Sequence, residues 1–320
     1  MPLDLATNPD GALIAGFTVF VLAALALDLF VLHRDAHVVG TREALSWTAV
    51  WVSLAVAFGF VLFAIKGSAT ALEYFTGYAI EYSLSMDNVF VFTLIFGAFA
   101  IPAQFQHRVL FWGVLGALVM RAAMILAGTA LIERWGFILT LFGAFLIFTG
   151  FRMLRDREDH APDPERNILV RVARRILPVE GKVMDGRFFV RIGRRRAATP
   201  LFLALLAVEF SDLIFAVDSI PAIFAVTTDP LVVYTSNAFA ILGLRSLYFL
   251  LADAARRFRY LSTGLAVILL FIGTKLVLAE WVHLPPLASL AVVLGVLGVA
   301  LVASLRADRR ERAAADGAEA

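Results

Sequence analysis

The sequence predicts an all-α, polytopic membrane protein, and three observations lead to this prediction. The chain of 320 residues is 61% hydrophobic and 17% charged, whereas soluble domains are about 45–50% apolar. Apolar runs long enough to cross a hydrocarbon layer of about 30 Å as helices recur along the whole length. None of them alternates apolar and polar residues with a period of two, as membrane strands do. We therefore expect the chain to span the bilayer as helices.

Nine spans are predicted in chain order. They cover residues 12–32, 46–65, 72–100, 109–131, 135–152, 200–226, 231–251, 259–280 and 286–305. The first apolar run is longer than that of a signal peptide and no small-residue cleavage site follows it, so it is interpreted as a retained helix. On this division, five spans lie in 1–152, a hydrophilic connection in 153–199, four spans in 200–305 and a frayed tail in 306–320.

The distribution of Lys and Arg predicts the orientation of the chain. Outside the spans, the connections on one side of the membrane hold all of these residues except Lys66 and Arg134. Because basic residues gather on the cytosolic side, the N-terminus is expected outside and the C-terminus inside. The basic residues thus set the topology, and the net charge of +2 gives no indication of nucleic-acid binding.

Residues 153–199 form the longest hydrophilic segment, which is rich in arginine. The stretch KVMDGRFFVRI within it predicts a short hairpin that turns at Asp185 and Gly186. We interpret the segment as a cytosolic connection that enforces topology, with the binding of a protein or anionic-lipid partner as the alternative. The chain has no cysteine, which excludes disulfides, thiolate metal sites and dithiol redox chemistry.

Two acidic pairs recur with the same spacing. Five residues separate Glu81 from Asp87 in the third span, and five separate Asp212 from Asp218 in the sixth. In each case the following span carries a single arginine. An offset of three spans places the two copies in opposite orientations, which predicts an inverted-topology repeat. Transporters built in this way bind their substrate at the repeat interface near the bilayer midplane.

Ionisable and amide side chains lie inside the predicted spans. The acidic candidates for a metal site are Glu81, Asp87, Glu209, Asp212 and Asp218, and the supporting candidates are Asn88, Asn237, Arg121, Arg245 and Lys275. A charge at the bilayer centre costs about 2.5–3.5 kcal/mol on insertion scales, so these groups are expected to face the protein interior. Pairing the five acids with the three cations leaves two negative charges. A bound divalent cation and two bound protons are both consistent with this excess.

Helix geometry separates the acids of the sixth span. Glu209 and Asp212 share one face, whereas Asp212 and Asp218 point about 120° apart and lie about 9 Å apart along the axis. Pro221 predicts either a broken helix, whose freed Val217 carbonyl would help to coordinate a cation, or a plain kink. One straight helix therefore does not enclose an ion with both aspartates.

The donor atoms indicate the kind of ion. Carboxylate, amide and carbonyl oxygens favour hard cations such as Mn²⁺, Mg²⁺ and Ca²⁺. All five histidines fall in connections or at the ends of spans, so a zinc site of imidazoles is not expected. The thioether of Met86, beside Asp87, would favour Mn²⁺ as a ligand, although packing against a neighbour is the simpler interpretation.

Three segments resemble the TerC family of integral membrane proteins, namely EYSLSMDNVFVF, RRRAATPLF and VEFSDLIFAVDSIPAIFAVTTDPLVVYTSNAFAILGLRSLYF. The resemblance extends from about residue 12 to residue 304. It implies membership of the wider LysE-type transporter group and efflux of a metal ion, with Mn²⁺ as the leading substrate; the family name refers to tellurium resistance. It also implies that the ion site consists of Glu81, Asp87, Glu209, Asp212 and Asp218, the same acids that were selected from the spans.

The sequence and the resemblance together predict a proton-coupled exporter of a divalent cation in the bacterial inner membrane, with no enzymatic activity and no resident cofactor. The rival hypothesis is a membrane scaffold that assembles or metallates exported proteins through residues 153–199. Export of a tellurite oxyanion fits less well, because Arg121 and Arg245 would have to bind it within an acidic core.

Overall fold

The computed structural model describes residues 9–27, 39–155, 171, 175, 186–192, 195–252, 260–279, 281 and 284–318. Within these ranges the chain forms nine helices and one two-stranded hairpin. The helices are α1 (Pro9–Leu27), α2 (Thr41–Lys66), α3 (Ser68–Ala98), α4 (Ala103–Arg134), α5 (Phe137–Arg155), α7 (Pro200–Phe224), α8 (Pro230–Leu251), α9 (Leu261–Val277) and α10 (Pro286–Ala318). Each of them overlaps one of the nine predicted spans, which confirms the all-α membrane architecture.

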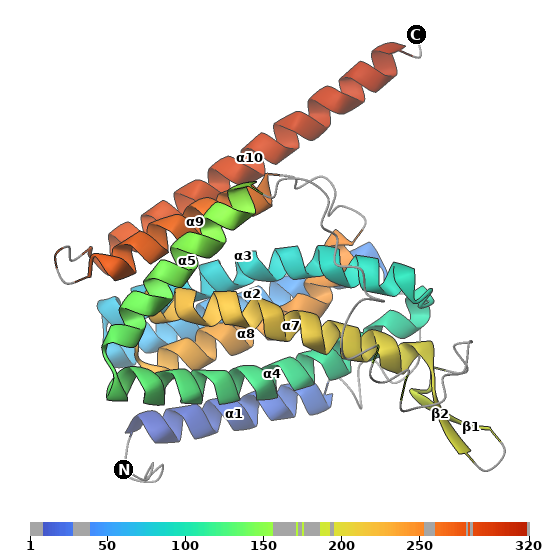
Figure 1. Cartoon of the computed structure of the whole chain (residues 1–320), viewed down its shortest axis with the longest axis horizontal. Helices are drawn as coiled ribbons and strands as arrows, with labels where there is room; N and C mark the ends of the chain where they lie inside the picture. The colour runs from blue at the N-terminus through green and yellow to red at the C-terminus, as the bar shows by residue number, and fades with distance from the viewer. Residues whose placement is uncertain are drawn as a thin grey trace.

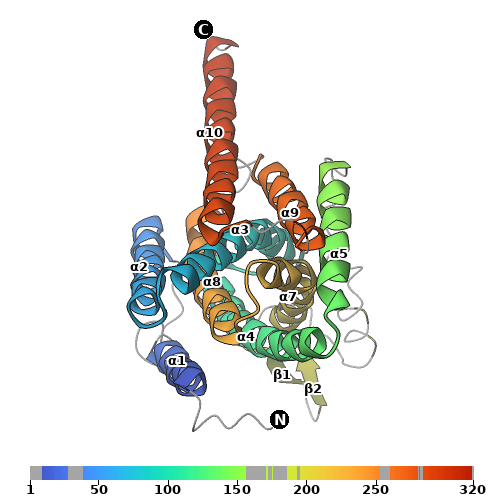
Figure 2. The same cartoon turned by 90° about the vertical axis from the view of Figure 1, so that its left-hand side faces the viewer.

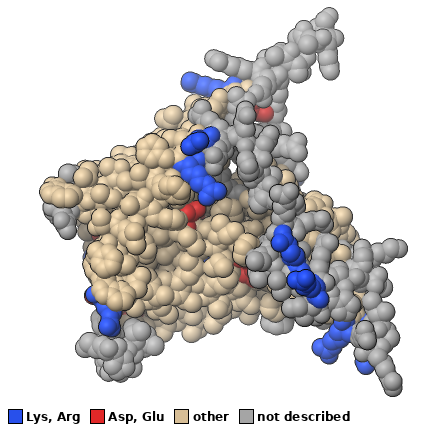
Figure 3. All heavy atoms as spheres, in the orientation of Figure 1, with Lys and Arg blue, Asp and Glu red and all other residues tan. Residues whose placement is uncertain are grey.

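Seven of these helices are long and apolar enough to cross a membrane, and the other two are α8 and α9. α9 has 17 residues, and α8 is largely enclosed by its neighbours, with 16 of its 22 residues buried. The outward faces of the peripheral helices carry exposed apolar side chains such as Phe60, Phe148 and Val299. Figure 3 shows a broad area of uncharged residues on one face, flanked by Lys and Arg. A surface of this kind suits contact with lipid.

Four helices form the centre of the bundle: α3, α4, α7 and α8 (Figure 2). α3 packs along α8 and α4 packs along α7, and these two pairs also contact each other. α1 and α2 flank the centre on one side, and α5, α9 and α10 flank it on the other (Figures 1 and 2). The acids of the third and sixth spans therefore belong to two central helices. The orientation in the membrane and the inverted repeat stay predictions.

α5 and α9 approach each other closely through glycines. A Cβ atom added at Gly273 would lie 2.7 Å from the carbonyl oxygen of Gly143, and one added at Gly143 would lie 2.9 Å from the carbonyl oxygen of Gly273. Small residues at helix interfaces permit this backbone contact within a membrane.

Gly273→Ala is expected to lower the free energy of unfolding by about 1–3 kcal/mol, because α9 has to move away from the backbone of α5. Gly295→Ala in α10 is the matched control, since a Cβ atom there meets nothing within 4 Å and alanine favours a helix. Thermal unfolding in detergent compares the two variants. Equal melting temperatures would contradict the close contact.

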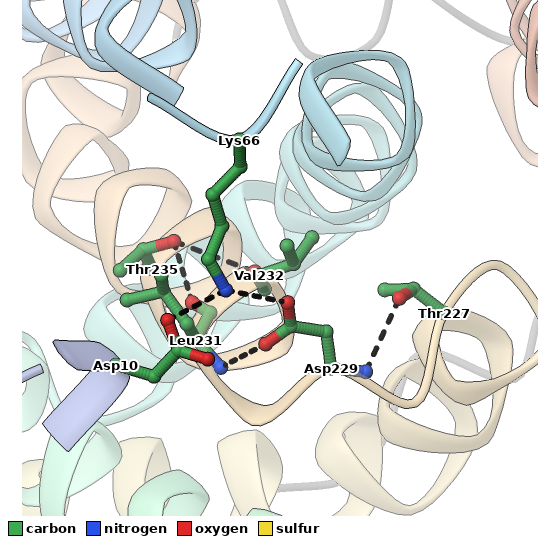
Figure 4. A network of polar contacts seen from close by, with 7 residues as sticks. All are labelled: Asp10, Lys66, Thr227, Asp229, Leu231, Val232 and Thr235. Atoms are coloured by element: carbon green, nitrogen blue, oxygen red, sulfur yellow. Dashed lines mark hydrogen bonds and ion pairs between the residues drawn. The ribbon is translucent and has the colours of Figure 1, made fainter. Parts of the chain in front are cut away.

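Lys66 joins three helices at one end of the bundle (Figure 4). Its ammonium nitrogen lies 2.6 Å from Asp10 Oδ1 and 3.3 Å from Asp229 Oδ2. Asp229 also caps the start of α8, where its Oδ1 accepts a hydrogen bond of 2.9 Å from the N–H of Leu231. α1, α2 and α8 are thereby linked at the end that the Lys and Arg distribution predicts to be extracellular.

The hairpin that the structure describes lies further along the chain than the predicted one. β1 (Phe189–Ile192) pairs antiparallel with β2 (Arg195–Ala198). Gly186 does occupy a turn with a φ of 66°, which glycine adopts readily, but this turn lies against Phe105 of α4. The described hairpin therefore differs from the predicted one, whose first strand lies outside the described residues. Asp185 and most of residues 153–185 lie outside the described residues.

The C-terminal segment also differs from the expectation of a frayed tail after residue 305. α10 continues to Ala318 and extends away from the other helices (Figures 1 and 2). The segment from Arg306 onward is polar, so it does not belong to an apolar run, but its alanine, arginine and glutamate are strong helix formers. Polarity ends the span without ending the helix.

Candidate ion-binding site

Arg121 of α4 reaches into the centre of the bundle and binds acids of both neighbouring helices. Its side chain is 2% exposed, and Nη1 forms an ion pair with Glu81 Oε1 of α3. Nη2 and Nε donate to Asp212 Oδ1 and Oδ2 of α7 at 2.9 and 3.2 Å. A bidentate contact of this kind is the strong form of an arginine–carboxylate pair.

Ser219 of α7 completes this group, which we call the Arg121 cluster (Glu81, Arg121, Asp212 and Ser219). The Ser219 hydroxyl accepts a hydrogen bond of 3.3 Å from Arg121 Nη1 and donates one of 3.4 Å to Glu81 Oε1. Glu81 and Asp212 are 0% and 2% exposed, and they share one arginine. When both acids are ionised, the cluster carries an excess negative charge that is costly to bury. A proton or a bound cation would balance it.

Asp218 faces a different neighbour from Asp212, as the six-residue offset predicts. Thr149 of α5 donates a hydrogen bond of 3.4 Å to Asp218 Oδ1. The charge of Arg152, in the last turn of α5, also acts on this carboxylate. Asp218 thus lies toward α5, whereas Asp212 lies toward α4.

Glu209 lies against α4, one helical turn before Asp212. Its carboxylate occupies the space that a Cβ atom at Gly116 would fill. The glycine therefore leaves room for an acid between α4 and α7, and any larger residue at position 116 would displace Glu209.

The two candidate asparagines are buried and incompletely hydrogen-bonded. Asn88 of α3 and Asn237 of α8 are each 1% exposed. Among the residues that the structure describes, Asn88 Oδ1 and Asn237 Nδ2 have no hydrogen-bond partner. The backbone of Asp87 is part of α3, and its side chain is not among those that the structure describes.

Arg245 does not join the Arg121 cluster. It lines two cavities of about 10 Å³ each, one with Trp47 and His107 and the other with Trp51 and Val114. Each is about the size of one water molecule. Arg121 and Arg245, which occupy matching positions in the predicted repeat, therefore have different surroundings.

Lys275 lies where α9 meets α10 and α3. Its ammonium donates a hydrogen bond of 3.0 Å to Ser289 of α10, and the charge of Glu73 of α3 acts on it. The acid whose charge acts on Lys275 is thus Glu73 and not one of the five candidate acids. Sequence reasoning overlooked Glu73 because it lies at the start of a span, where an acid is common.

The described part of the chain holds no group of three Asp, Glu or His side chains that could bind a metal ion. Arg121 lies between Glu81 and Asp212, and Asp218 faces α5. The convergence of all five acids on one ion stays a prediction.

Pro221 does not interrupt α7, which continues as a helix to Phe224. The predicted break is therefore not observed. Proline has no N–H to donate to the carbonyl of Val217.

Three residues that act on the candidate acids were missing from the sequence-based selection: Ser219 and Thr149, which donate hydrogen bonds to them, and Arg152, which acts through its charge. Two of them are hydroxyl residues, which usually bond within their own helix, so their type and position alone gave no signal. Arg152 is the last residue of the fifth predicted span, so it was interpreted as an end of the span and not as a group of the interior.

Comparisons with known proteins show the family. The family described as "Integral membrane protein TerC family" matches residues 66–312. The "Uncharacterized membrane protein STKORF319" of Myxococcus xanthus is 53% identical over 293 residues, which cover 91% of each chain. The "Putative membrane-bound redox modulator Alx" of Escherichia coli strain K12 is 49% identical over 291 residues, covering 88% of this chain and 90% of the relative. No solved structure matches. The chain belongs to the TerC family of integral membrane proteins.

Proposed function

We propose that the protein exports a divalent cation, with Mn²⁺ as its substrate, across the bacterial inner membrane. The observation that carries the proposal is the Arg121 cluster, in which two buried acids on α3 and α7 share one arginine. Ionisable groups within a membrane mark ion pathways by default. Carboxylate oxygens also match the preference of hard divalent cations.

In this proposal Arg121 holds the empty site together. Its guanidinium lies between Glu81 and Asp212, where a divalent cation would neutralise the same two acids. The cation therefore has to displace the arginine from at least one carboxylate. Since α3, α4 and α7 each contribute one charge, this displacement would couple ion binding to a rearrangement of the central helices, as alternating access requires.

Protons would return as the metal leaves. Metal ligands have to be deprotonated, so metal binding releases protons and metal release takes them up. The excess negative charge of the Arg121 cluster gives the empty site a reason to hold a proton. Proton-coupled export follows from this competition for the same oxygens.

Asp87→Asn and Asp218→Asn are each expected to abolish export, because each removes a charged oxygen from the proposed ion path. Cells that express the wild-type protein should hold less cytosolic Mn²⁺ than cells without it, and cells with either variant should not. Glu133→Gln, at an exposed acid near the end of α4, is the control and should export like the wild type. The site assignment is wrong if both aspartate variants lower cytosolic Mn²⁺ as well as the wild-type protein does.

The name of the Escherichia coli relative suggests an effect on redox state. This chain has no cysteine, so it carries no thiol for such chemistry. Metal export therefore remains the proposal that the buried groups support.

A second candidate function, a membrane scaffold, is favoured by the exposed basic side chains of the hairpin region. Arg187, Arg191 and Arg196 are all exposed there, and such groups attract anionic lipids or an acidic partner. Replacing Arg187, Arg191 and Arg196 by glutamine separates the two functions, because it removes the basic side chains and leaves the helices intact. Metal flux into liposomes without these side chains supports the exporter, whereas a lost cellular phenotype with intact flux supports the scaffold.

A further inference from the structure

Three buried oxygens on one face of α3 have no hydrogen-bond partner among the described residues. They are Glu81 Oε2, Ser85 Oγ and Asn88 Oδ1. The three side chains are 0%, 1% and 1% exposed. Buried polar atoms are hydrogen-bonded in the great majority of cases, so three orphans in succession indicate a missing binding partner.

The spacing of these residues places them one after another along the same face of α3. Positions four and seven residues apart fall within an arc of about 60° on a helix and extend for about 10 Å along it. We call Glu81, Ser85 and Asn88 the α3 oxygen file. Its first member belongs to the Arg121 cluster through Oε1, while Oε2 stays available.

The next position on the same face leads toward the second acid of the cluster. Phe92, four residues after Asn88, lines a cavity of about 10 Å³ together with Val208, Leu244 and Asp212. A cavity of this size holds about one water molecule. This cavity lies between α3, α4, α7 and α8 beside Asp212, next to the last residue of the file along α3.

The neighbouring Ser83 shows how a serine hydroxyl in this helix is hydrogen-bonded. Ser83 Oγ donates a hydrogen bond of 2.6 Å to the carbonyl of Ala79, and Ser83 is 4% exposed. Serine in a membrane helix normally makes this bond to its own backbone. Ser85, two residues later, does not.

We propose that Ser85 and Asn88, three residues apart on one face of α3, form a second binding position for the transported divalent cation, from which the ion passes to Glu81 Oε2 of the Arg121 cluster. The proposal rests on the proposed export function. Hydroxyl, amide and carboxylate oxygens are ligands that hard divalent cations accept. Because the oxygens follow one another along the helix, the ion reaches them in succession. It binds here while Arg121 still occupies the space between Glu81 and Asp212.

The test is Mn²⁺ binding by the purified full-length protein, measured from the electron paramagnetic resonance signal of free Mn²⁺. Ser85→Ala and Asn88→Leu are each expected to raise the Kd about tenfold, the effect of losing one net polar contact. Ser83→Ala is the matched control and should bind like the wild type. Asn88→Asp supplies a carboxylate oxygen at the same place and should bind at least as tightly as the wild type.

Stability without metal separates a ligand from a structural group. Removing an unpartnered buried hydroxyl leaves no new orphan, so metal-free Ser85→Ala should melt at or above the wild-type temperature. A clear loss of stability in metal-free Ser85→Ala would show a structural role and overturn the proposal.

The outcomes distinguish this inference from the export function. Unchanged Mn²⁺ affinity in Ser85→Ala and Asn88→Leu, together with lost affinity in Asp218→Asn, overturns the α3 position and leaves export standing. If Mn²⁺ binding depends on Ser85 and Asn88 but liposomes show no Mn²⁺ flux, the export function is overturned and the binding position on α3 is supported. A wild-type protein that neither binds nor transports Mn²⁺ overturns both.

Discussion

Arg121→Leu is expected to lower the free energy of unfolding by about 3–5 kcal/mol, the cost of leaving a buried charge without its partner. The substitution removes the cation from Glu81 and Asp212, which are both buried. Thermal unfolding of the metal-free protein measures the loss. Mn²⁺ should then raise the melting temperature of Arg121→Leu more than that of the wild type, because the ion no longer competes with the guanidinium.

Two comparison variants make this result specific. Arg134→Leu, at an exposed arginine at the end of the same helix, should cost little, since exposed charges contribute about 0–1 kcal/mol. Adding Glu81→Gln and Asp212→Asn to Arg121→Leu should recover much of the stability without recovering transport. If Arg121→Leu and Arg134→Leu melt at the same temperature, Arg121 does not hold the two acids together.

Mn²⁺ binding by the purified protein is expected to strengthen between about pH 6 and 8, by about tenfold per pH unit for each proton displaced. At the lower pH, protons occupy the oxygens that the metal needs, so the Kd is high. At the higher pH the oxygens are free and the Kd falls. The buried acids titrate together because their charges interact.

The control for this prediction is the double variant Asp87→Asn and Asp218→Asn, in which the dependence on pH should flatten. Isothermal titration at a series of pH values measures both proteins. A wild-type affinity that is constant over this range would mean that the acids stay in permanent pairs with Arg121 and the other intramembrane cations. In that case the metal would bind elsewhere.

The helices were predictable because a membrane span has a simple physical signature. An apolar run of about 20 residues is long enough to cross the bilayer and has few alternatives. The prediction failed where polarity and helix propensity disagree, as in α10 after residue 305, and it did not include the hairpin of β1 and β2. Local patterns do not report which strand will pair with β1.

The candidate site was predictable only in part. Charge balance indicates that the intramembrane acids need compensation, and helix periodicity separates Asp212 from Asp218. Neither tells which arginine reaches which acid, because that depends on the packing of α4 between α3 and α7. The orphaned hydroxyl of Ser85 was equally invisible, since only the fold shows that it lacks the backbone bond that Ser83 makes.

The most direct test of the account is Mn²⁺ flux into liposomes that contain only the purified protein, followed by quenching of an enclosed dye. The account predicts flux with the wild type and none with Glu81→Gln or Asp218→Asn, provided that both variants are folded. A pH-sensitive dye should report proton movement in the opposite direction. Flux through both variants at the wild-type rate, or no flux with the wild-type protein, would contradict the claim that these buried acids carry a divalent cation.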